Sequence, residues 1–171
     1  MALAARGLLL TLTLAALTAC SGPAAPDPPT AGRPDSPAVP TGIALQVVEL
    51  TNAERTRAGL AVFRINARLG EAARIQAEQI AAAGRLDHVV RDARYPRLED
   101  RLDAAEYRWQ AAGENLAFGQ QSAAAVVAGW MQSPGHRANI LHATFTEIGV
   151  AYLTDTNGRP YYAQVLGRPI P

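Results

Sequence analysis

Lysine is absent from this 171-residue chain, cysteine occurs once, and aromatic residues make up only 6%. All sixteen basic residues are therefore arginines, and with fifteen acidic residues they leave a formal net charge of +1. Binding to nucleic acid phosphates needs a concentrated basic surface, which this balance does not provide. A single cysteine also excludes the internal disulfides that commonly support small secreted domains.

Apolar residues, in contrast, make up 49% of the chain, which is ample for a core. The length suits one folded domain with appendages. Charges alternate in sign along residues 91–108, and this pattern predicts a solvated face rather than a site for a polyanion.

The N-terminus reads as an export signal. One positive charge, Arg6, precedes an apolar run over residues 7–17, which has the length of a signal-peptide core and is short for a bilayer span. The run ends in Leu-Thr-Ala-Cys at residues 17–20, which resembles the lipobox of bacterial lipoproteins. That resemblance implies a signal peptide over residues 1–19, lipid on Cys20, and an exported protein anchored at the cell envelope. The alternatives are an ordinary secretory signal with an incidental cysteine, or an uncleaved anchor.

Residues 20–42 contain seven prolines among small and polar residues, with no apolar periodicity. Such proline density favours extended polyproline II and excludes helix or sheet ladders. At about 3.1 Å per residue, the segment would reach roughly 60–70 Å. We predict a disordered tether here, followed by a folded domain over residues 43–171.

Four helices are expected in that domain, followed by a turn or a short helical turn after Pro134. The first is amphipathic, with Thr51 on its polar side, and the second is capped at its start by Asn66 and at its end by Gly84. Ser122 caps a later one. The segments cover residues 43–58, 66–83, 96–107, 123–130 and 136–141. The core face of the second helix comprises Leu69, Ala72, Ala73, Gln76 and Ile80.

Extended structure is strongest at the C-terminus, where residues 147–153 and 160–166 flank a turn of Asp, Thr, Asn and Gly. Residues 108–118 are expected to hold another strand, and residues 60–65 form a short connector of extended character. Helices together with a small antiparallel sheet indicate an α+β fold or an α-β-α sandwich.

Candidate functional residues concentrate in residues 111–141. Glu114 stands in an apolar stretch, so a buried carboxylate would need a partner, either backbone N–H groups or histidines in a cleft. His136 follows Ser133, a proline and a glycine, which fix the direction of the chain. His88 lies in a polar loop. Trp130 is expected in the core and His142 on the surface.

Five blocks, in order, resemble the CAP superfamily (SCP domains: cysteine-rich secretory proteins, antigen 5 and pathogenesis-related 1 proteins) in its short bacterial form. The resemblance covers residues 47–167. The blocks are residues 49–66, the Ala-rich helix followed by His88, and residues 113–117, 130–141 and 147–151. It implies a three-layer α-β-α sandwich with a central cleft.

In eukaryotic members of that family, two His and two Glu line the cleft. The resemblance places His88, Glu114 and His136 at three of these positions, and Ser133 stands where the second Glu is expected. Any function that requires all four groups is therefore in question for this chain.

Two imidazoles and a carboxylate would suit a divalent metal with open positions, so His88, Glu114 and His136 are predicted to bind zinc or a similar ion. The same residues are the catalytic candidates of an alternative, a hydrolase or peptidase that uses the same cleft, with Ser133 as the nucleophile in one version of it. Against the serine version, Ser133 has a capping role and lacks the Gly-x-Ser-x-Gly pattern. We favour a binding module for a small apolar ligand or another envelope component, with its ligand and oligomeric state left open.

Overall fold

Helix α1 (Gly42–Arg57) opens the part of the chain that the structure, a computed structural model, describes: residues 40–171. The predicted signal peptide, the predicted lipid site at Cys20 and all but the last residues of the predicted tether lie outside this range. Among the described helices, none combines the length and apolar character needed to cross a membrane. The remaining elements are β1 (Arg64–Ile65), α2 (Ala67–Ala83), α3 (Leu98–Ala104), β2 (Trp109–Phe118), α4 (Ala123–Gln132), α5 (Pro134–Ile140), β3 (Glu147–Thr154) and β4 (Pro160–Pro169).

The strands form one sheet in the order β1-β3-β4-β2. β4 pairs antiparallel with β3 and with β2, whereas β1 pairs parallel with β3. The sheet is therefore mixed: β2, β3 and β4 pair antiparallel as predicted, and the two-residue β1 adds one parallel pair at the edge. The connector docks there because Arg64 N donates to Thr146 O at 3.0 Å and Asn66 N donates to Ile148 O at 2.9 Å.

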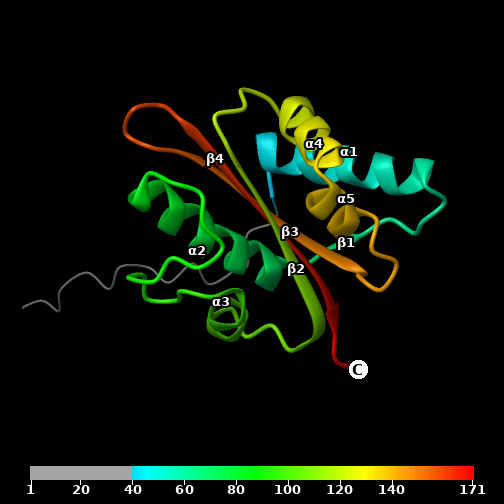
Figure 1. Ribbon diagram of the computed structural model, residues 1–171. Coiled ribbons are helices and arrows are strands. Elements are labelled where there is room, and N and C mark those ends of the chain that lie inside the picture. The colour runs from blue at the N-terminus through cyan, green and yellow to red at the C-terminus, as the bar shows by residue number, and fades with distance from the viewer. Residues whose placement is uncertain (1–39) are drawn as a thin grey trace, which may run out of the picture. The chain divides into compact units, whose positions relative to one another are not determined.

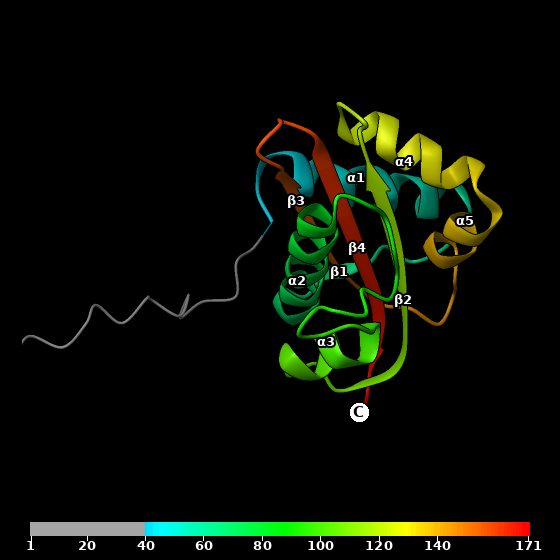
Figure 2. The same cartoon turned by 60° about the vertical axis from the view of Figure 1, so that its left-hand side comes forward.

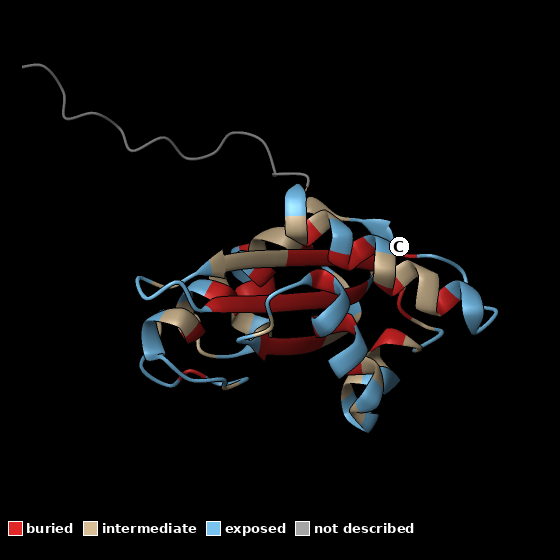
Figure 3. Ribbon diagram, turned by 90° about the horizontal axis from the view of Figure 1, so that it is seen from above, coloured by how far each residue is buried: buried red, intermediate tan, exposed pale blue. Residues whose placement is uncertain are grey.

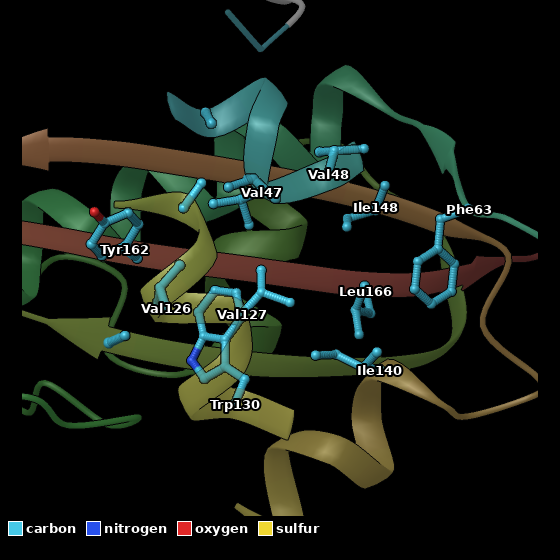
Figure 4. Close-up of a cluster of buried hydrophobic side chains, with 14 of the residues drawn as sticks. Val47, Val48, Phe63, Val126, Val127, Trp130, Ile140, Ile148, Tyr162 and Leu166 are labelled. Atoms are coloured by element: carbon cyan, nitrogen blue, oxygen red, sulfur yellow. The ribbon is translucent and has the colours of Figure 1, made fainter. Parts of the chain in front are cut away.

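Helices cover both faces of this sheet. α2 and α3 lie on one face, and α1, α4 and α5 lie on the other (Figure 1). The strands between these layers are largely buried, while the outer helix faces are exposed (Figure 3). Alternate residues of β4 divide between two apolar clusters: Tyr161, Ala163 and Val165 pack under α2, and Tyr162 and Leu166 pack under α1 and α4. Figure 4 shows the second cluster, to which α4 contributes Val126, Val127 and Trp130.

Local signals set the helix boundaries as predicted. The Asn66 side chain accepts from the N–H groups of Arg68 and Leu69, and Ser122 accepts from Ala125 N at 3.2 Å. Gly84 ends α2 in the left-handed region at φ 64°. The predicted core face of α2 is buried throughout. α3 is shorter than expected, because Pro96 and Arg97 precede its first turn and the chain turns at Ala105.

The polar side predicted for α1 is wrong at Thr51. This residue is buried, and its hydroxyl accepts from Gln164 Nε2 at 3.0 Å. Arg55, one turn later, is also buried, and its guanidinium lies 3.7 Å above the Phe63 ring. It donates to Ala61 O at 2.7 Å and to Ile140 O at 2.8 Å. Arg55 thereby ties the end of α5 to α1.

β2 is an edge strand, and its outer edge is covered by side chains. Trp130 Nε1 donates to Leu116 O at 3.0 Å, and Asn139 Nδ2 donates to Glu114 O at 3.1 Å. These contacts satisfy carbonyls that would otherwise be open to another strand. They also bring α4 and α5 alongside the segment that carries Glu114.

Candidate functional site

Glu114 lies near the middle of β2, and its side chain is only 3% exposed. Alternation along the strand directs it to the face covered by α2 and α3, where Leu116 also packs. Its carboxylate has two partners: His88 Nδ1 lies 2.8 Å from Oε1, and Arg101 Nη2 lies 2.8 Å from Oε2. Both carboxylate oxygens therefore have a side-chain partner. Of the two expected kinds of partner, backbone N–H groups or histidines, the structure has a histidine.

His88 sits in the loop between α2 and α3, with 60% of its side chain exposed. Helix α2 holds both ends of this loop, since Gln76 donates to Asp87 O at 2.8 Å and Gln79 donates to Tyr95 O at 3.1 Å. The hydrogen bond to Glu114 raises the pKa of His88, although partial burial opposes it. A carboxylate only accepts, so His88 Nδ1 is the donor, and in the neutral ring Nε2 carries the free lone pair.

Arg101 is the residue that sequence reasoning missed. It lies on α3 with a side chain that is 0% exposed, so the prediction of a solvated face is wrong at this position. Besides Glu114, it donates to Tyr95 O at 3.3 Å, to Pro96 O at 3.1 Å and to His88 O at 3.5 Å. The helical spacing of the sequence could have indicated that Arg101 is buried. It falls three residues after Leu98, on the apolar face of the helix that also contains Leu102 and Ala105.

His136 belongs to α5, which packs on the face of the sheet opposite to α2 and α3 (Figure 2). Its backbone carbonyl accepts from Asn115 Nδ2 at 3.2 Å, and the same amide nitrogen donates to Gln164 Oε1 at 2.9 Å. Burial lowers the pKa of His136, and the charge of His88 lowers it further. The two imidazoles therefore belong to elements in different helical layers.

The predicted residues come together only in part. His88 and Glu114 are in direct contact, whereas no hydrogen bond within residues 40–171 joins either Glu114 or Ser133 to the His136 ring. In the described part of the chain, no group of three or more His, Cys, Asp or Glu side chains is arranged to hold a metal. Ser133 caps α5 through its backbone position, with no side-chain hydrogen bond. His142 is exposed, as predicted, and its ring stacks on that of Phe145.

Residues 48–166 match the profile of the family described as CAP, the Cysteine-rich secretory protein family. The chain is 37% identical over 123 residues to uncharacterized protein YkwD of Bacillus subtilis, covering 72% of this chain and 46% of that protein. It is 34% identical over 119 residues to uncharacterized membrane protein YlbC of the same bacterium, covering 70% and 32%. The chain therefore spans less than half the length of either relative.

Solved structures of the same kind superpose on the domain. An extracellular protein containing a SCP domain from Bacillus anthracis gives a TM-score of 0.67 at 28% identity, over 74% of this chain and 40% of that one. An outer surface protein from Borrelia burgdorferi gives 0.68 at 18% identity, over 77% and 97%, which is a likeness of fold. Together with the layers described above, these matches confirm the predicted fold class.

Proposed function

Because this chain belongs to the CAP (Cysteine-rich secretory protein) family, we propose that it serves as a binding module at the bacterial cell envelope. The candidate ligand site is the pair of imidazoles, His88 and His136. One observation carries the choice of binding over a hydrolase built on Ser133, His136 and Glu114: both oxygens of Glu114 already have partners, at 2.8 Å each. A carboxylate held in this way supports a histidine and is not free to activate water or to orient His136 toward Ser133.

A divalent metal such as zinc fits the donors that remain. His88 Nε2 faces away from the carboxylate, and this carboxylate–histidine arrangement is typical behind histidines that bind metals. Within the described residues, neither ring nitrogen of His136 makes a hydrogen bond. Two imidazoles leave other positions open to water or to a further ligand, so weak binding is expected. A bound ion would act as a Lewis acid or as a bridge to that ligand.

A small apolar ligand is the second candidate. Leu86 and Val89 are both 37% exposed on the loop that carries His88. Such side chains beside an imidazole would suit a molecule with an apolar body and one polar group.

Calorimetry with zinc tests the metal site directly. We expect the wild-type chain to bind and the His88→Ala/His136→Ala double variant to lose binding. The matched control is His142→Ala, which removes the exposed third histidine and should bind as wild type does. Equal binding by wild type and the double variant would exclude the proposed site. Labelling by a fluorophosphonate probe that requires Ser133 would favour the hydrolase alternative instead.

Anchoring at the envelope is proposed from the lipobox-like residues 17–20. The descriptions of two relatives, an extracellular protein and a membrane protein, agree with an exported location. Incorporation of a clickable fatty acid into the full chain tests this point. Label should disappear in Cys20→Ala and persist in Ser21→Ala; a Cys20→Ala variant that still incorporates label would rule out lipid on this cysteine.

A further inference from the structure

The burial of the charged residue Arg101 is not readily explained by a gain in stability. A buried ion pair loses so much hydration that apolar residues of similar volume are often as stable or more so. The Arg101–Glu114 pair is nevertheless nearly completely buried, with side chains 0% and 3% exposed. His88, whose side chain is 60% exposed, hydrogen-bonds the other oxygen of the same carboxylate.

The contacts of Arg101 converge on His88 by two routes. Through Glu114, the guanidinium fixes the carboxylate so that Oε1 faces His88 Nδ1. Through the backbone, it holds carbonyls at both ends of the loop that carries His88, namely His88 O, Tyr95 O and Pro96 O. A planar guanidinium can make these contacts together because its donors point in fixed directions.

We propose that Arg101 is the positioning residue of this site: acting through Glu114, it holds His88 in the tautomer with the proton on Nδ1 and presents Nε2 to the ligand. This inference rests on the function proposed above, in which His88 Nε2 is the atom that binds the ligand. Charge-assisted hydrogen bonds are strong enough to favour one tautomer by more than about tenfold. Residues that orient metal ligands in this way typically change metal affinity by about 10–100-fold when removed.

Long-range ¹H–¹⁵N NMR of the histidine rings reads the tautomer without any ligand. At about pH 9, well above the usual pKa of an imidazole, the metal-free wild-type chain should show His88 with its proton on Nδ1. Arg101→Met should give a mixture of the two tautomers at His88 and leave His142 unchanged. Arg97→Met is the matched control, since it removes an exposed arginine beside the same helix and should leave the His88 tautomer as in wild type.

A double variant tests whether Arg101 acts through the carboxylate. Adding Arg101→Met to Glu114→Gln should not change the His88 tautomer further, since the link is already broken. A folded Arg101→Met protein that keeps the proton on Nδ1 would overturn the proposal. So would a wild-type His88 with its proton on Nε2, a result that needs no variant to fold. Zinc affinity should fall about tenfold in Arg101→Met; if the wild-type chain binds no zinc, the metal proposal fails while the tautomer still decides the role of Arg101.

Discussion

Gly149 on β3 marks the closest approach between the sheet and α2, and replacing it with alanine is a sharp test of this packing. A Cβ at Gly149 would lie 2.1 Å from Gly70 N and from Leu69 C, where ordinary contact begins at 3.4 Å. All these neighbours are backbone atoms near the start of α2, so no side-chain rotation can relieve the clash. Helix and strand would have to separate by more than 1 Å. That separation would loosen the interface that buries Leu69 and Ala72.

Extra methylenes in a close-packed core cost about 1–3 kcal/mol, and occasionally more. Because the clash here is with backbone, we expect Gly149→Ala to destabilise by about 3 kcal/mol or more, which lowers Tm by roughly 10 °C for a domain of this size. Gly129→Ala is the matched control: nothing lies within 4 Å of its Cβ position, and alanine inside α4 should stabilise by about 0.5–1 kcal/mol. Urea and thermal unfolding followed by circular dichroism measure both. A Gly149→Ala protein within about 1 kcal/mol of wild type would refute the close packing of α2 on β3.

Two further predictions concern the buried guanidinium of Arg55 and the two histidines of the candidate site. Arg55→Met should destabilise the domain by about 3 kcal/mol, because it leaves several carbonyls without donors, whereas the exposed Arg57→Met should change urea unfolding little. In an NMR titration of the metal-free protein, the pKa of His88 should lie above 6.5 and that of His136 below it, and Glu114→Gln should lower the pKa of His88. Because the pKa of His88 is raised on folding, its pair with Glu114 stabilises the protein fully below pH 6.5 and loses this effect as the pH rises through the folded-state pKa. Superimposable titrations of the two rings would contradict the assigned contacts.

Local signals in the sequence predicted the local features well. The caps at Asn66, Gly84 and Ser122 need only neighbouring residues, and the core face of α2 follows from helical spacing. For Glu114, the apolar surroundings in the sequence indicate that a buried carboxylate needs a partner. They do not decide between backbone N–H groups and histidines as that partner. The structure supplies His88, from a loop 26 residues earlier in the chain.

The errors share a physical cause, which is that their partners are distant in sequence. Thr51 is buried because Gln164, 113 residues later, donates to it. Arg101 belongs to an alternating charge pattern that looks solvated, yet a carboxylate on β2 compensates its burial. β1 pairs parallel through two backbone bonds to a segment more than 80 residues away. Arg101 alone of the three leaves a periodic trace, its helical spacing with Leu98 and Leu102, while the contacts of Thr51 and β1 leave none.

Adjacent residues on β2 explain how one strand supports both imidazoles. Because successive side chains point to opposite faces of a sheet, Glu114 enters the layer of α2 and α3, while Asn115 enters the layer of α1 and α5. Glu114 then holds His88 by its ring, and Asn115 holds His136 by its backbone carbonyl at 3.2 Å. A slip of one residue in the pairing of β2 with β4 would exchange these two side chains and remove both supports together. The register of this edge strand, fixed on its outer side by Trp130 and Asn139, therefore sets the supports of both histidines.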